Sequence, residues 1–173
     1  MPGKERLRAK RFYRTALSLA VMCWCVQAAA QSTPDKVIPS GSILDTPQSF
    51  DGNIDPEGLI EGSVRIDPAV LNGGTLNVFN GAVLTIDPNQ GTPGSVELFS
   101  HYVSGAPNDV IWIAGGTVRI APSSFGVDLI GTGAVRGVYM PESARGPGYL
   151  DATNVRIQMN GPRNADGIQA YGP

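Results

Sequence analysis

The chain has 173 residues, and its 13 Lys and Arg against 15 Asp and Glu give a formal net charge of −2. Six of the basic residues lie within the first fourteen positions, so residues 31–173 are more acidic, with seven basic and fourteen acidic side chains. Scattered arginines on an acidic chain argue against a nucleic-acid partner, which requires clustered positive charge, and against a polybasic membrane patch.

The first thirty residues have the pattern of a secretory signal peptide. A basic start precedes a short apolar run, and three alanines, 28–30, follow. The run is shorter than the roughly 20 residues of a transmembrane helix. We therefore predict a signal peptide over residues 1–30, cleaved between Ala30 and Gln31 after the small residues Ala28 and Ala30, and export across the inner membrane.

The next stretch, residues 31–56, is rich in Ser, Thr, Pro, Asp and Gly. Its composition predicts an irregular N-terminal lead-in with one short strand at most. Both cysteines, Cys23 and Cys25, belong to the predicted signal. The exported part must therefore be stabilised by packing and backbone hydrogen bonds, without the disulfides that small secreted domains often use. No apolar stretch in it predicts a transmembrane segment.

From residue 57 the sequence predicts short β-strands. Apolar and polar residues alternate in runs bounded by Gly, Asn, Asp or Pro, which is the pattern of half-buried strands. No apolar run with helical spacing predicts a long helix. The predicted strands are 63–66, 75–78, 82–86, 95–98, 110–113, 117–120 and 154–157.

Similar segments recur among these strands. A small polar residue followed by Val-Arg-Ile begins at Ser63, Thr117 and Asn154, and a second pair of segments places Gly137 and Gly167 30 residues apart. Strands this short bury enough surface only when they stack on like strands about 4.8 Å away. We therefore predict an all-β solenoid of about five or six coils. The alternative is a β-sandwich, which would need longer, evenly spaced strands.

Two regions combine short alternating apolar runs with glycine and asparagine in a pattern known from one protein family. They are Gly73-Gly-Thr-Leu-Asn-Val-Phe-Asn-Gly-Ala-Val-Leu-Thr-Ile86, and Ala152-Thr-Asn-Val-Arg-Ile-Gln-Met-Asn-Gly161 followed by Asn164-Ala-Asp-Gly-Ile-Gln-Ala170. They resemble the passenger domains of bacterial autotransporters, most closely the pertactin-like branch. The resemblance implies a right-handed parallel β-helix over residues 57–173. It also implies a cell-surface protein of the outer membrane that acts as an adhesin or virulence factor or, in some branches, as a protease or esterase.

The sequence departs from that family at its C-terminus. Family members carry a C-terminal β-barrel that takes the passenger across the outer membrane, and the strands of such a barrel have 9–11 residues. This chain stops at Pro173 without such strands. We interpret it as an N-terminal passenger fragment, truncated within a coil. The expected location is the periplasm or the medium, and the cell surface only if a translocator is supplied.

The sequence contains no motif that predicts catalysis, a cofactor or a metal. His101 is the only histidine, and without a Gly-x-Ser-x-Gly nucleophile elbow it is predicted to be a loop residue beside Tyr102. The acids of residues 51–57 lack the spacing of a calcium loop and predict a turn. Trp112, in the most hydrophobic predicted strand, and Tyr139 are predicted to be packed in the interior.

Three arginines are candidate ligand contacts. Arg65, Arg119 and Arg156 occupy the same place in the three Val-Arg-Ile segments. If those segments stack, the arginines form an outward ladder that could bind acidic or sulfated glycans. The alternative is a set of solvated strand-face charges with acids such as Glu97 in neighbouring rows.

The sequence therefore supports three functional hypotheses. The first is a non-enzymatic, exported passenger segment that binds a host surface or a glycan ligand. The second is a small secreted β-helix lyase or hydrolase of polysaccharides, which would need carboxylates about 5–10 Å apart across a groove. The third is an inert truncated product.

Overall fold

The computed structural model describes residues 33–69, 73–101, 108–133, 136–160 and 167–171. The predicted signal peptide, with Ala28, Ala30 and Gln31, lies outside these residues. From Pro34 onward the chain forms one compact unit. The described residues contain no helix, and hence none that is long and apolar enough to cross a bilayer.

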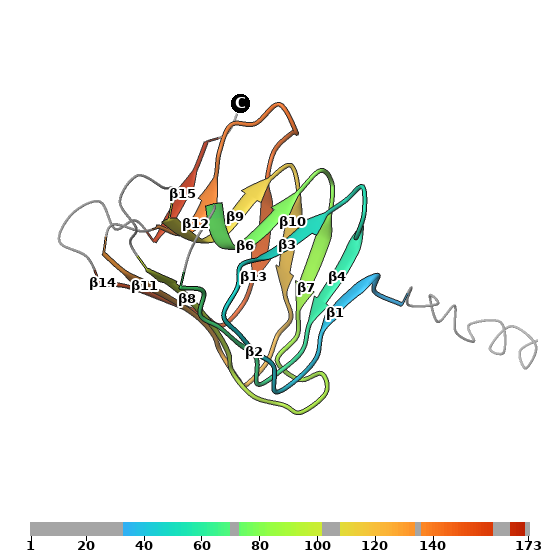
Figure 1. Cartoon of the computed structure of the whole chain (residues 1–173), viewed down its shortest axis with the longest axis vertical. Coiled ribbons are helices and arrows are strands. Elements are labelled where there is room, and N and C mark those ends of the chain that lie inside the picture. The colour runs from blue at the N-terminus through green and yellow to red at the C-terminus, as the bar shows by residue number, and fades with distance from the viewer. Residues whose placement is uncertain (1–32, 70–72, 102–107, 134–135, 161–166, 172–173) are drawn as a thin grey trace, which may run out of the picture. The chain divides into compact units, whose positions relative to one another are not determined.

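Within the described residues, fifteen strands form three five-stranded sheets, which we call A, B and C (Figure 1). Sheet A contains β1 (Lys36–Ile38), β4 (Glu57–Ile60), β7 (Val83–Ile86), β10 (Thr117–Ile120) and β13 (Tyr149–Ala152). Sheet B contains β2 (Ile43–Leu44), β5 (Arg65–Ile66), β8 (Val96–His101), β11 (Val127–Thr132) and β14 (Val155–Asn160). Sheet C contains β3 (Gln48–Asp51), β6 (Gly73–Phe79), β9 (Asn108–Ala114), β12 (Arg136–Met140) and β15 (Ile168–Ala170).

The sheets are built by one repeated coil. Each strand pairs in parallel with the strand three places later, so one coil contributes one strand to each sheet. Four full turns lead from β1 to β13, and the strands of the last coil complete five coils. Parallel pairing throughout makes this a β-solenoid, or parallel β-helix, and not the antiparallel β-sandwich.

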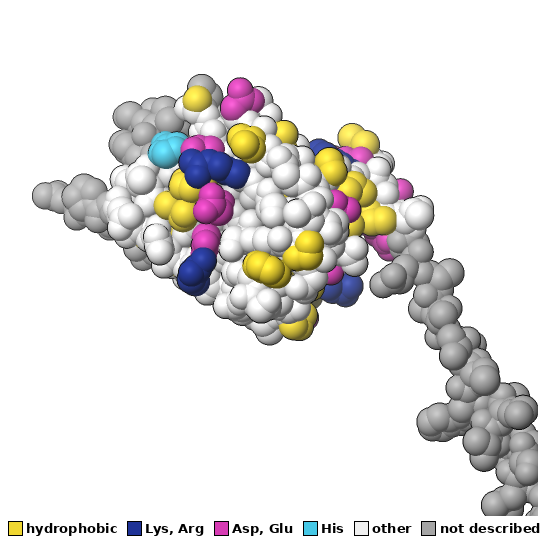
Figure 2. All heavy atoms as spheres, turned by 90° about the horizontal axis from the view of Figure 1, so that it is seen from below, with side chains coloured by type: hydrophobic (Ala, Val, Ile, Leu, Met, Phe, Trp, Pro, Cys, Tyr) yellow, Lys and Arg dark blue, Asp and Glu magenta, His cyan; other side chains and the backbone are white. Residues whose placement is uncertain are grey.

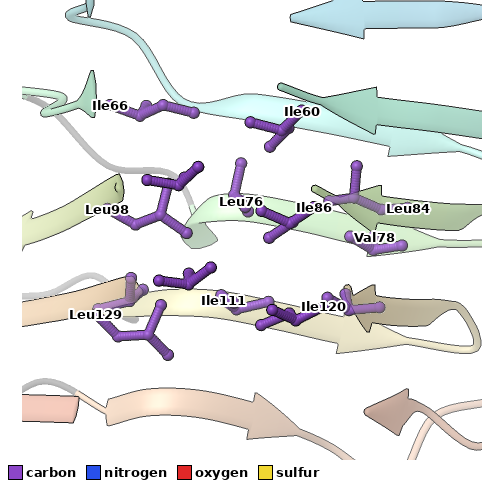
Figure 3. Packing of buried hydrophobic residues seen from close by; sticks show 14 of the residues in the cluster. Ile60, Ile66, Leu76, Val78, Leu84, Ile86, Leu98, Ile111, Ile120 and Leu129 are labelled. Atoms are coloured by element: carbon purple, nitrogen blue, oxygen red, sulfur yellow. The ribbon is translucent and has the colours of Figure 1, made fainter. Parts of the chain in front are cut away.

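Inward columns of aliphatic side chains form the core. In sheet B the register aligns Ile66, Leu98, Leu129 and Ile157, and the first three are fully buried. Figure 3 shows such side chains from neighbouring coils meeting between the sheets. Because successive side chains of a strand point to opposite faces, a strand of two to six residues buries its alternate apolar positions and leaves the others outside.

The sequence repeats match the coils in part. Ser63 and Asn154 each stand shortly before a strand of sheet B with positive φ, 59° and 55°, a backbone conformation in which the chain can turn a corner. Thr117 instead begins β10 in sheet A. The second repeat is confirmed, since Val138 and Ile168, the residues after its two glycines, pair in register.

All seven predicted strands overlap strands of the structure, but residues 31–56 differ from the expectation. The predicted lead-in contains β1, β2 and β3, which pair with β4, β5 and β6 and so form the first coil. These strands have only two to four residues. Such short runs, separated by Pro39 and Pro47, hide the alternation that reveals a strand.

The two ends of the solenoid differ. In the first coil, the inward residues Ile38 and Phe50 are only 4% and 0% exposed. The Phe50 ring lies so close to Gly58 that a Cβ there would stand 2.3 Å from ring Cδ1. At the other end, aliphatic residues of the last coils, among them Leu150 and Ile157, line a cavity of about 310 Å³.

Candidate functional site

The outer side of sheet B carries a row of charges. Across β5, β8, β11 and β14 the register aligns Arg65, Glu97, Asp128 and Arg156. Asp67 follows β5 directly, and His101 ends β8. We call the side chains of Arg65, Asp67, Glu97, His101, Asp128 and Arg156 the charged face. Figure 2 shows basic and acidic side chains gathered in one patch with the histidine at its border.

Arg65 binds two acids of the charged face. Its guanidinium donates to Oδ2 of Asp67 at 2.8 Å and to Oε2 of Glu97 at 3.2 Å. It also lies over the ring of Phe99, 4.0 Å from the centroid. The hydrogen bond to Asp67 is the main cause that raises the pKa of Arg65. The contacts with Glu97 and Phe99 link the second coil to the third.

Arg156 makes the corresponding link between the fourth and fifth coils. Its Nε and Nη2 donate to the two carboxylate oxygens of Asp128 at 2.5 and 2.7 Å. This bidentate hydrogen bond raises the pKa of Arg156. The Arg156 side chain is nevertheless 61% exposed, and its Nη1 makes no hydrogen bond to any described residue. One side of the guanidinium is therefore free to meet another acid.

His101 is the last residue of β8 and not the predicted loop residue, because β8 pairs with β11 as far as Thr132. Its Nε2 lies 2.7 Å from Oδ1 of Asp67, and its Nδ1 lies 2.8 Å from Oγ1 of Thr132. Burial raises the pKa of Asp67, but the hydrogen bonds from His101 and Arg65 outweigh burial and hold that pKa below its usual value. Hydroxyl, imidazole and carboxylate are the groups of a nucleophilic relay, here on three adjacent strands.

Sheet C contains a second, more buried ion pair. Arg136 donates from Nε and Nη2 to the two carboxylate oxygens of Asp109 at 2.6 and 3.0 Å, and the two side chains are 23% and 1% exposed. Burial raises the pKa of Asp109 despite its partner. Arg136 Nη1 donates to Oε1 of Gln169 at 3.0 Å, and the guanidinium covers the ring of Tyr139. Because these groups bind one another, the cluster joins three coils.

The three candidate arginines do not form one ladder. Arg65 and Arg156 share a column of sheet B, but two acids, one of them Glu97, separate them. Arg119 lies in sheet A next to Asp151 in the register. The expectation failed because Val-Arg-Ile satisfies the inward–outward alternation of any strand, so the motif does not identify the sheet that contains it.

The acidic segment over residues 51–57 contains the predicted turn, at residues 52–54, between Asp51 at the end of β3 and Glu57 at the start of β4. Oδ1 of Asp51 accepts hydrogen bonds from the backbone N–H of Asn53 at 3.0 Å and from Nδ2 of Asn80 at 2.9 Å. These hydrogen bonds lower the pKa of Asp51. Among the described side chains, no group of three His, Cys, Asp or Glu is arranged to hold a metal ion.

The two aromatic residues predicted to be packed, Trp112 and Tyr139, are register neighbours on the outer side of sheet C, and both are half-buried. Trp112 is half-buried on the outer side of β9, between the inward residues Ile111 and Ile113. Its strand is hydrophobic, but alternation places the indole outside the core. Tyr139 is likewise outside the core: the guanidinium of Arg136 covers its ring, and the Tyr171 ring meets it edge-on, with centroids 6.1 Å apart.

Sequence reasoning missed the residues that complete these contacts: Asp67, Asp109, Asp128 and Thr132. Asp128 had a local signal, an acid between the apolar residues of Val127-Asp-Leu129, where alternation predicts an outward side chain. Its partner Arg156 is 28 residues away, and only the strand register brings the two together. The sequence contained no comparable signal for the hydroxyl and acid around His101.

Comparison of the chain with protein-family models, curated proteins and solved structures finds no match, so the geometry of these faces is the basis on which a function is inferred.

Proposed function

We propose that the chain forms an exported, non-catalytic β-solenoid that binds partners at a cell surface through the outer faces of its strands. Export rests on the predicted signal peptide over residues 1–30, and the adhesive role on the resemblance to autotransporter passengers. The observation that supports it best is a contrast in sheet B: the inward residues repeat from coil to coil, whereas the outward residues do not.

Sheet B illustrates this contrast. The inward column contains only leucine and isoleucine, whereas the outward column beside it changes from Arg65 through Glu97 and Asp128 to Arg156. Because the uniform core fixes the spacing of the strands, the outward side chains can vary in charge and size without disturbing the packing. Solenoid proteins build extended binding surfaces in this way.

The charge pattern favours a protein partner over a polyanion. A sulfated glycan would find each arginine of the charged face already paired with an acid, Arg156 with Asp128 and Arg65 with Glu97. A protein surface that carries charges of both signs could complement the charged face without breaking its internal pairs. We therefore infer that the ligand is a host-surface protein.

A binding assay with purified residues 31–173 tests this proposal. Extracellular-matrix proteins and a glycan array are the probes, and Glu97→Lys is compared with Asp151→Lys, a matched change on the outer side of sheet A. We expect saturable binding to a protein probe, reduced about tenfold or more by Glu97→Lys and unchanged by Asp151→Lys. Equal losses in both variants, or binding to glycans alone, would reject the charged face as the binding surface.

Hydrolysis is a second candidate function, favoured by one observation, the contacts of His101 with Thr132 and Asp67. In such a relay the imidazole would take the Thr132 proton as the hydroxyl attacks an ester carbonyl, the imidazolium would return that proton to the departing alcohol, and water would then hydrolyse the acyl-threonine. Incubation with activated esters and O-acetylated polysaccharides, followed by product analysis, tests it. Turnover that Thr132→Val abolishes would support hydrolysis and refute a purely non-catalytic role.

A further inference from the structure

The outer side of sheet B contains two apolar side chains next to the charged face. Phe99 of β8 and Ile130 of β11 are register neighbours, and both are outward and half-buried. We call them the apolar pair. Figure 2 shows hydrophobic side chains beside the row of charges. Because β8 and β11 are each paired on both sides, the apolar pair lies away from the ends of the solenoid.

Polar groups surround the apolar pair and hold one another in place. On one side, Arg65 lies over the Phe99 ring and donates a hydrogen bond to Glu97. On the other side, the hydroxyl of Thr132 lies 2.8 Å from Nδ1 of His101. An apolar centre within a polar rim is the usual anatomy of a protein–protein interface. Because the rim is already ordered by its own contacts, a partner that binds here loses less affinity to the ordering of side chains.

The two acids beside the apolar pair would be complemented by a cation. Glu97 and Asp128 are register neighbours, and adjacent strands lie about 4.8 Å apart. Each acid binds an arginine on its far side, Arg65 and Arg156 respectively, so two like charges lie side by side in the middle of the row and repel each other. Oε1 of Glu97 makes no hydrogen bond to any described residue, and the side chain is 40% exposed.

We propose that the partner of the charged face is a protein segment that places a lysine or arginine between Glu97 and Asp128 and a large apolar side chain on the apolar pair. An extended segment fits both positions, because residues i and i+2 of a strand point to the same side, about 6.6 Å apart, as Glu97 and Phe99 do. The partner would therefore be recognised by the pattern basic–x–apolar. This inference rests on the proposed function, of which it specifies the partner.

Three capped heptapeptides are the probes. The parent has the sequence Thr-Thr-Lys-Thr-Phe-Thr-Thr, the second has Glu in place of Lys, and the third has Ser in place of Phe. Each would be titrated into isotopically labelled residues 31–173 while backbone amides are followed by NMR. The protein variants are Glu97→Lys, Ile130→Ser and, as the matched control, Val83→Ser, which truncates a half-buried outward residue of sheet A. Circular dichroism verifies the fold of each variant.

We expect the parent peptide to shift amides around Phe99 and Ile130. Its affinity should fall at least about threefold when its Lys or its Phe is replaced, because the charge complement or the apolar anchor is then lost. Ile130→Ser should weaken the parent peptide by a similar factor, and Val83→Ser should leave it unchanged. Glu97→Lys should reverse the charge preference, so that the Glu peptide binds more tightly than the parent.

Equal affinity of the three peptides, no shifts around Phe99 and Ile130, or equal losses in Ile130→Ser and Val83→Ser would overturn the proposal. Binding of heparin that Ile130→Ser weakens would also overturn it, since the occupant would then be a polyanion. The assay with matrix proteins distinguishes this failure from failure of the proposed function. If a matrix protein still loses affinity for Glu97→Lys, the charged face binds a protein of another sequence pattern. If no matrix protein binds, the proposed function fails as well.

Discussion

The first and fifth coils have the same three-strand plan but different coverage of their inward residues. Phe50 in the first coil is fully buried against Gly58. Leu150 and Ile157 in the fifth coil line a cavity and are only partly buried. In a solenoid each inner coil is covered by its two neighbours, whereas a terminal coil has a neighbour on one side only and needs other residues to cover its apolar side chains. In the described first coil Phe50 fills much of the layer, although Leu44 is only partly buried, whereas in the described fifth coil both Leu150 and Ile157 are only partly buried.

The largest expected difference comes from truncating one inward residue at each end. Phe50→Ala should lower the free energy of unfolding by about 3–5 kcal/mol, because it opens a cavity beneath a buried ring. Ile157→Ala should cost only about 1 kcal/mol, since that side chain is already partly exposed. Urea unfolding of residues 31–173 measures both. Similar losses at the two positions would mean that the ends do not differ in packing.

The two bidentate arginine–aspartate pairs allow a second comparison. Arg136→Gln should destabilise the chain by about 3–5 kcal/mol, because it leaves the carboxylate of Asp109 buried without its partner. The loss should shrink at acid pH, where protonation of Asp109 removes the buried charge. Arg156→Gln, at the exposed end, should be nearly neutral. Thermal unfolding of both variants at pH 7 and pH 4 tests this. A pH-independent loss in Arg136→Gln would refute the role of the buried charge.

Replacing one glycine near each end by alanine compares the packing of the two ends, because each substitution adds a single methyl group. Gly58→Ala places a Cβ 2.3 Å from the Phe50 ring and should cost about 1–3 kcal/mol through overpacking. Gly167→Ala, in the fifth coil, meets its nearest atom, a methyl of Ile157, at 3.9 Å and should change stability little. Chemical denaturation of the two variants in parallel gives both values. An unaffected Gly58→Ala variant would show that the ring can move away freely.

The smallest expected effect is the pH dependence of the charged face. The pKa of Asp67 is lowered in the folded chain, because the hydrogen bonds from His101 and Arg65 outweigh burial. Its contribution is therefore present above the unfolded pKa of about 3.9 and is lost as pH falls through the folded value. Asp67→Asn should lose stability at pH 5 relative to the native chain, and the gap should narrow towards pH 2.5. Asp151→Asn is the control, and a constant gap would contradict the assignment.

The sequence predicted the fold well because alternation and glycine-bounded runs are local properties. The alternation of Thr117-Val-Arg-Ile120 alone predicted a strand. The similar segments around Gly137 and Gly167 predicted two strands that pair in register, Val138 opposite Ile168. The first coil was missed because its strands are too short to show alternation. The arrangement of Arg65, Arg119 and Arg156 depends on which strand of the coil each occupies, and this follows from loop lengths that differ between coils.

Backbone hydrogen exchange of residues 31–173 tests the central claim, that the first coil is closed and the fifth open, most directly. Amides in β4–β12 should exchange slowest, since their strands are paired on both sides. Among the edge strands, β3 around Phe50 should be markedly better protected than β14 around Ile157, because exchange follows local opening and β14 has less buried apolar surface to hold it. Equal protection of β3 and β14, or faster exchange in β3, would contradict the account.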